Sequence, residues 1–176
     1  GRFSMEGLVH FYTGDGKGKT TAAIGLAVRA AGAGRKVVFA QFMKGMDTSE
    51  LAPLKTLGVQ VVRKGTVTKF VPYMTEDERA LCAAQQAETL AEARRLVPED
   101  GVLVLDEIAS AVTTGMVPAE DVLALLNAKP AGTEVVMTGR QPPQALLDKA
   151  DYISEMRCVR HPYDTKGVGA RKGIEY

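Results

Sequence analysis

Thr13-Gly14-Asp15-Gly16-Lys17-Gly18-Lys19-Thr20-Thr21 lies between an apolar run at residues 8–12 and an alanine-rich run at residues 22–31. Its glycines allow backbone angles that residues with a Cβ avoid, so successive N–H groups can turn toward phosphate oxygens. A helix that opens at Gly18 adds the positive end of its dipole. The stretch therefore predicts a phosphate-binding loop (P-loop) between a buried strand and a helix.

Two side chains of this loop have the chemistry that a bound nucleotide needs. Lys19 can reach phosphate oxygens as a point charge, and the Thr20 hydroxyl can ligate the Mg²⁺ that bridges them. The match to G-x-x-x-x-G-K-[ST] has one departure, because Thr13 stands where the first glycine is expected. The candidate nucleotide contacts are Thr13, Gly14, Asp15, Gly16, Lys17, Gly18, Lys19, Thr20 and Thr21.

A second motif follows an apolar run at residues 101–105, which ends in Asp106 and Glu107. This is the Walker B pattern, in which the sheet holds a carboxylate beside the phosphates, where Mg²⁺ needs oxygen ligands. Either acid could hold the metal, directly or through water, and the sequence leaves the choice open.

Arg140 comes just after another apolar run, residues 133–137. Open α/β sheets bind ligands at the carboxyl ends of their strands, so Arg140 is a candidate second cation for a triphosphate. The alternative is an arginine that is solvated at the end of a strand.

Strand and helix signals alternate along the whole chain. The expected strands are residues 8–12, 36–42, 59–63, 101–105, 133–137 and 151–156, and the expected helices are 18–32, 51–57, 75–97, 118–126 and 142–150. Such alternation predicts a three-layer, P-loop NTPase-like α/β domain, with a mainly parallel sheet and helices on both faces. We expect the first helix to be well buried and residues 157–176 to form packed irregular structure.

Length and composition favour one domain that acts on small molecules. The chain has 176 residues, 45% of them hydrophobic, and a formal net charge of +1. A net charge this close to zero suggests neither nucleic acid nor a membrane as partner. We expect a cytoplasmic protein. Residues 1–4 look like a cloning scar, so the expected domain is residues 5–176.

The remaining reactive residues support no familiar catalytic group. His10 and His161 have no evident serine or cysteine nucleophile arranged around them, and Cys82 and Cys158 fit neither a redox pair nor a metal site. The predicted chemistry is therefore positioning and charge stabilisation at a bound nucleotide. These motifs leave open a kinase or ATPase, and also a nucleotide-sensing module without turnover.

Several segments together resemble the P-loop ATP:cob(I)alamin (corrinoid) adenosyltransferases. They are Tyr12 to Ala23, Gln41-Phe42-Met43-Lys44-Gly45, Leu105-Asp106-Glu107, Thr138-Gly139-Arg140, Ala150-Asp151, Glu155-Met156, Arg160-His161-Pro162 and Gly173-Ile174-Glu175-Tyr176. The resemblance covers almost the whole chain from Gly7 onward.

The resemblance implies that Co(I) of a reduced corrinoid attacks C5′ of ATP and expels inorganic triphosphate. It implies Lys19 and Arg140 as catalytic cations, and Mg²⁺ on Thr20 with Asp106 or Glu107. It also implies an electron donor such as a reduced flavoprotein, and a homodimer. The candidate corrinoid contacts are Phe42, Met43, Phe70 and Tyr73. The acceptor, complete cobalamin or a biosynthetic precursor, stays open.

Overall fold

A computed structural model describes residues 6–176, so the expected cloning scar, residues 1–4, lies outside the described residues. Within the described part, six parallel strands form one sheet in the order β3-β2-β4-β5-β1-β6. The strands are β1 (Val9–Thr13), β2 (Val37–Gln41), β3 (Gln60–Val62), β4 (Val102–Asp106), β5 (Glu134–Thr138) and β6 (Tyr152–Glu155). The predicted parallel α/β fold is confirmed.

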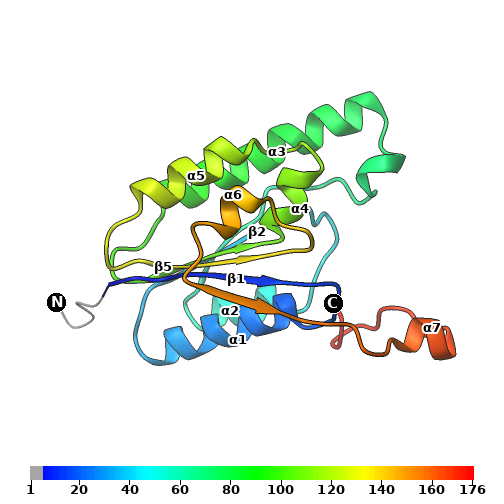
Figure 1. Cartoon of the computed structure of the whole chain (residues 1–176), viewed down its shortest axis with the longest axis horizontal. Helices are drawn as coiled ribbons and strands as arrows, with labels where there is room; N and C mark the ends of the chain where they lie inside the picture. The colour runs from blue at the N-terminus through cyan, green and yellow to red at the C-terminus, as the bar shows by residue number, and fades with distance from the viewer. Residues whose placement is uncertain (1–5) are drawn as a thin grey trace.

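Helices cover both faces of this sheet (Figure 1). On one side lie α1 (Lys19–Gly32) and α2 (Leu51–Thr56), and on the other lie α3 (Glu76–Arg95), α4 (Ile108–Thr113), α5 (Ala119–Ala128) and α6 (Gln144–Leu147). The sequence did not predict α4. The short 3₁₀ helix η1 (Val71–Tyr73) precedes α3, and α7 (Pro162–Lys166) lies in the C-terminal arm, residues 157–176.

Both faces of the central strands are buried, which explains their continuous apolar runs. In β4, Leu103 and Leu105 belong to the core under α3, α4 and α5, while Val102 and Val104 belong to the core under α1 and α2. Because these strands are parallel, the carboxyl ends of β1, β2, β4 and β5 lie at one edge of the sheet.

Two expectations about burial were wrong. Only one stripe of α1 is buried, at Lys19, Ala23, Ala27 and Ala30, while Val28 on the opposite side is 43% exposed. The C-terminal arm is almost wholly exposed rather than packed, and it extends beyond the sheet to α7 (Figure 1). In the described residues, no helix is both long and apolar enough to cross a bilayer.

Candidate functional site

The loop between β1 and α1 turns at two glycines with positive φ, Gly14 at 105° and Gly18 at 119°. Gly18 is the N-cap of α1, and no side chain caps this end of the helix. The first N–H groups of α1 are therefore left without a side-chain partner at the positive end of the helix dipole. This arrangement suits a bound anion such as phosphate.

The end of β6 packs directly against the same loop. A Cβ at Gly14 or Gly16 would overlap the carbonyl of Met156. Gly16 N donates to Met156 O over 2.7 Å, and Met156 N donates to Thr13 O over 2.8 Å. The Gly16 N–H is thus used by the protein itself, so the glycine spacing provides close packing as well as room for phosphate. The sequence predicted only the second role.

Lys19 is buried at the start of α1, with 8% of its surface exposed. Its Nζ donates to Gly16 O over 2.9 Å, which closes the loop on itself. Burial lowers the pKa of the Lys19 ammonium, and the Arg140 charge lowers this pKa further. Glu107, Asp15 and Asp106 act in the opposite direction. The Lys19 amino group therefore lies in a dehydrated position next to the loop.

Asp106 is fully buried at the end of β4 and accepts four contacts. Its Oδ1 accepts from the hydroxyls of Thr20 at 2.9 Å and Thr138 at 2.8 Å. Its Oδ2 accepts from Gln41 Nε2 at 3.1 Å and from Lys44 Nζ at 3.4 Å. The carboxylate therefore connects the P-loop helix with the ends of β2 and β5. The sequence motifs predicted no role for Gln41, Lys44 or Thr138, although all three follow or end strands at this edge.

Glu107 turns away from Asp106 at a positive φ of 62°. Its N–H donates to the Thr138 hydroxyl over 2.8 Å, and its Oε2 accepts from Ser110 Oγ over 2.9 Å. Of the two acids, Asp106 is the one in contact with Thr20. Nowhere in residues 6–176 do three or more His, Cys, Asp or Glu side chains form a cluster that could hold a metal.

Arg140 is exposed, and its Nη2 donates to Asp15 O over a long distance of 3.5 Å. Its charge acts on the pKa of Lys19. The structure therefore brings Arg140 to the P-loop, on the β5 side of the sheet edge.

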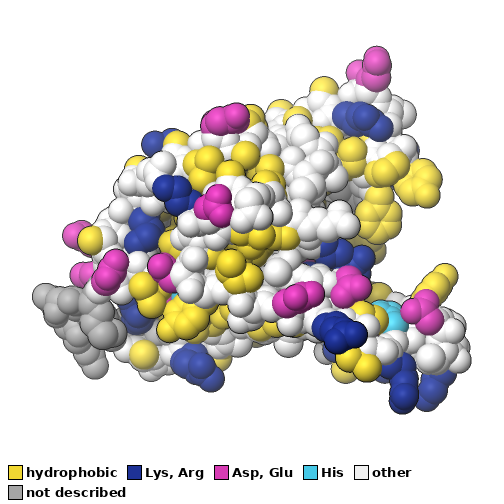
Figure 2. Space-filling view, viewed as in Figure 1, with side chains coloured by type: hydrophobic (Ala, Val, Ile, Leu, Met, Phe, Trp, Pro, Cys, Tyr) yellow, Lys and Arg dark blue, Asp and Glu magenta, His cyan; other side chains and the backbone are white. Residues whose placement is uncertain are grey.

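The four candidate corrinoid contacts differ in exposure. Phe70 and Tyr73 are 80% and 76% exposed, in the region before α3 where Figure 2 shows hydrophobic side chains at the surface. Met43 is half-buried and packs with the cluster of Met74, Cys82 and Met116. Phe42 is fully buried in the core, and its contact with a corrinoid stays a prediction.

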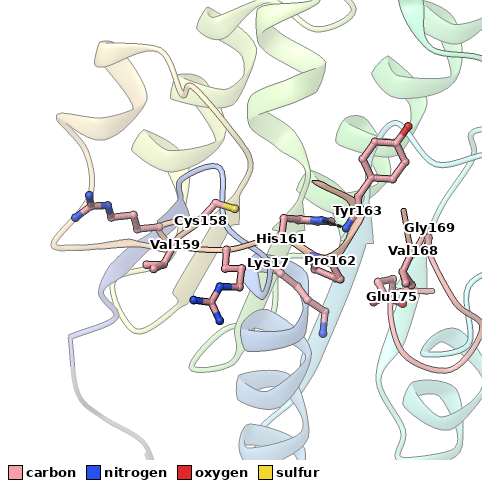
Figure 3. Close-up of a pocket in the computed structure, with 12 residues that line it drawn as sticks. Lys17, Cys158, Val159, His161, Pro162, Tyr163, Val168, Gly169 and Glu175 are labelled. Atoms are coloured by element: carbon pink, nitrogen blue, oxygen red, sulfur yellow. Dashed lines mark hydrogen bonds between the residues drawn. The ribbon is translucent and has the colours of Figure 1, made fainter. Parts of the chain in front are cut away.

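The C-terminal arm contacts the P-loop at one point and the segment before α2 at another. Cys158 N donates to Asp15 Oδ1 over 3.3 Å, and Ser49 Oγ donates to the Tyr176 carbonyl over 2.8 Å. Between the arm and Lys17 lies a pocket of about 570 Å³, whose lining Figure 3 shows. A second pocket of about 320 Å³ separates Thr20 and Thr21 from residues 173–176. Lys17, Thr20 and Thr21 therefore line pockets that the arm borders.

Comparison with known proteins identifies the family. A model of the family described as "ATP:corrinoid adenosyltransferase BtuR/CobO/CobP" matches residues 5–176. The chain belongs to this adenosyltransferase family. Corrinoid adenosyltransferase CobA of Salmonella typhimurium is 37% identical over 174 residues, which cover 97% of this chain and 86% of the relative. The corrinoid adenosyltransferase of Pseudomonas aeruginosa is 33% identical over 172 residues, which cover 97% and 84%.

Among solved structures, this chain matches the Pif1 helicase from Candida albicans, with a TM-score of 0.39 and 14% sequence identity. The match covers 88% of this chain and 37% of the helicase chain. At that TM-score the likeness has no bearing on function.

Proposed function

We propose that this protein transfers the 5′-deoxyadenosyl group of ATP to the Co(I) centre of a reduced corrinoid and releases inorganic triphosphate. One observation carries the proposal: a P-loop joined through Thr20 to the buried Asp106, in a chain that the adenosyltransferase family model matches from residue 5 to residue 176. The expected products are adenosylcobalamin, or the corresponding product of a precursor corrinoid, and triphosphate.

The reaction needs no nucleophile from the protein. Co(I) donates an electron pair to C5′, the C5′–O bond breaks, and its electron pair leaves on the triphosphate oxygen. Cobalt becomes alkyl-Co(III), and no proton is transferred. The protein's contribution is to align C5′ with the metal and to stabilise the charge that develops on the leaving triphosphate.

The residues at the loop fit this task. Lys19 contributes a buried ammonium, and the uncapped start of α1 contributes N–H groups. Arg140 contributes a guanidinium on the β5 side. Because Lys19 and the start of α1 are already held in place by the fold, these groups need little reorganisation as negative charge builds on the triphosphate.

The residues present also fit a Mg²⁺ ion. The Thr20 hydroxyl and the Asp106 carboxylate are oxygen donors that lie 2.9 Å apart, and Mg²⁺ in such sites takes its other ligands from phosphates and water. We assign Thr20 and Asp106 as ligands of this ion. Glu107, which contacts Ser110, is not assigned as a ligand. Bound there, Mg²⁺ would neutralise part of the triphosphate charge.

For the corrinoid we assign Phe70, Tyr73 and Met43, which offer exposed or half-buried apolar surface. Such a surface suits removal of the axial cobalt ligand before reduction from Co(II). The reduction itself requires a one-electron donor such as a reduced flavoprotein. We further propose that residues 5–176 form a single domain that works as a cytoplasmic homodimer.

The test is a single incubation of the protein with ATP, Mg²⁺ and chemically reduced cobalamin. The proposal predicts adenosylcobalamin in the absorbance spectrum and an equal amount of triphosphate by phosphorus NMR. Release of ADP, with or without cobalamin, would instead identify a kinase or ATPase. Binding of ATP without turnover would identify a nucleotide-sensing module.

A further inference from the structure

The turn after β2 has a backbone conformation that its residues do not favour. Met43 has a φ of 59°, in the left-handed region where a side chain with a Cβ is strained. This turn redirects the chain as it leaves the sheet, and Lys44 follows immediately. A strained backbone conformation persists only where neighbouring residues hold it, and such residues are concentrated at functional sites. The contacts of this turn therefore point to its function.

Three neighbouring elements hold this turn. Phe42 N donates to Asp106 O at the end of β4 over 2.9 Å. Met43 N donates to Oε1 of Gln86, a buried residue of α3, over 2.8 Å. Arg63 Nε donates to Lys44 O over 2.9 Å. The backbone on both sides of Lys44 is therefore fixed, and only its side chain can move.

The Lys44 side chain extends to the carboxylate that also contacts the P-loop. Its Nζ lies 3.4 Å from Asp106 Oδ2, and the side chain of Lys44 is 28% exposed while that of Asp106 is fully buried. In the described part of the chain, Lys44 is the one cation within ion-pair distance of Asp106. The other oxygen of Asp106 accepts from Thr20, so one carboxylate separates the Lys44 ammonium from the start of α1.

We propose that Lys44 is a third cation for the triphosphate of ATP, together with Lys19 and Arg140. With no nucleotide bound, Lys44 neutralises the buried Asp106. With nucleotide bound, its ammonium turns on the flexible lysine stem and contacts phosphate oxygens, which leaves Asp106 for Mg²⁺. This inference rests on the proposed function, because it takes the ligand to be the triphosphate of ATP.

The test measures binding of inorganic triphosphate by calorimetry, with saturating Mg²⁺ and no corrinoid. Lys44→Met removes the charge and keeps the length of the side chain, and Lys44→Arg restores the charge. Lys149→Met, at an exposed lysine just after α6, is the matched control. We expect Lys44→Met to weaken binding by roughly tenfold, the loss of one charge-assisted contact. Lys44→Arg should recover most of the affinity, and Lys149→Met should bind as the wild type does.

A Lys44→Met protein that is less stable to heat but binds triphosphate like the wild type would overturn the proposal, because Lys44 would then serve Asp106 alone. Should Lys44→Met fail to fold, Lys44→Gln gives the same comparison, since its amide retains a donor for Asp106 without the charge. Failure of the proposed function looks different: the wild type would then bind triphosphate but make no adenosylcobalamin.

Discussion

The Thr20 hydroxyl lies 2.9 Å from Oδ1 of Asp106, a contact between the first turn of α1 and the end of β4. These two residues are 86 positions apart in the chain. Their hydrogen bond means that the P-loop and the acidic strand end are held as one unit before any ligand arrives. Thr138 adds a third element, since its hydroxyl donates to the same oxygen.

Replacing Thr138 by valine should weaken both folding and ATP binding. The Thr138 hydroxyl donates to the buried Asp106 carboxylate and accepts from Glu107 N, so its loss removes a partner from each, at about 1–3 kcal/mol of unfolding free energy. ATP affinity should fall by roughly tenfold, about 1.4 kcal/mol, because Asp106 loses a donor that orients it.

Thr133→Val is the matched control for this experiment. Thr133 is equally buried just before the start of β5, and its hydroxyl donates to Pro98 O over 2.8 Å. It should lose comparable stability in chemical denaturation but keep ATP affinity. Equal ATP affinity in both variants would show that Thr138 acts only in folding.

Two glycine-to-alanine substitutions should have opposite effects on stability. A Cβ at Gly16 meets Met156 backbone, so Gly16→Ala should destabilise the protein by about 1–3 kcal/mol and abolish tight triphosphate binding. A Cβ at Gly25, inside α1, meets nothing within 4 Å, so Gly25→Ala should stabilise by about 0.5–1 kcal/mol. Thermal unfolding and calorimetry measure both effects. A stable, binding-competent Gly16→Ala protein would contradict the packing against β6.

Triphosphate affinity should decrease as the pH rises through the lowered pKa of Lys19. Burial and the Arg140 charge hold the pKa of Lys19 in the free protein below its ordinary value of 10.5. A bound polyanion favours the ammonium and raises this pKa, so binding takes up a proton between the two pKa values. Calorimetry in buffers of different ionisation enthalpy detects that uptake. In Lys19→Arg the uptake should disappear, because arginine keeps its charge; an unchanged uptake would assign it to another group.

Removing the exposed aromatics before α3 should affect the corrinoid and not ATP. Phe70 and Tyr73 are mostly solvent-exposed, so alanine at either position should change stability by less than about 0.5 kcal/mol. The KM for cobalamin should rise by roughly tenfold, within the range of one aromatic contact, and the KM for ATP should stay constant. Leu81→Ala, at an exposed apolar residue of α3, is the control. A cobalamin KM unchanged by both aromatic substitutions would remove these residues from the site.

The strands and most helices could be predicted because their signals are local. The helix expected at residues 75–97 is α3, whose start is fixed by a capping box of Thr75 and Glu78. Each apolar run forms a strand within one or two residues of its expected bounds. The helix α4 was missed because it has only six residues and begins directly after Glu107, where no capping residue or proline marks the start of a helix in the sequence. The arm was expected to pack, yet its apolar residues Val159 and Tyr163 remain exposed.

The site was predictable only where a residue belongs to a known motif. Lys19, Thr20 and Asp106 follow from two motifs, but the choice of Asp106 over Glu107 depends on which acid reaches Thr20, and only the fold determines that. Gln41 was missed for the same reason. Its contact with Asp106 depends on the pairing of β2 with β4, and no local pattern encodes the order of strands in a sheet.

The most direct test of the central claim is which bond of ATP is broken. ATP that carries oxygen-18 in the bridge between C5′ and the α-phosphorus is incubated with the protein and reduced cobalamin, and the products are analysed by mass spectrometry. Carbon–oxygen cleavage predicts that the label leaves in inorganic triphosphate while adenosylcobalamin forms without it. Label retained on the nucleoside, or found in ADP, would contradict the account.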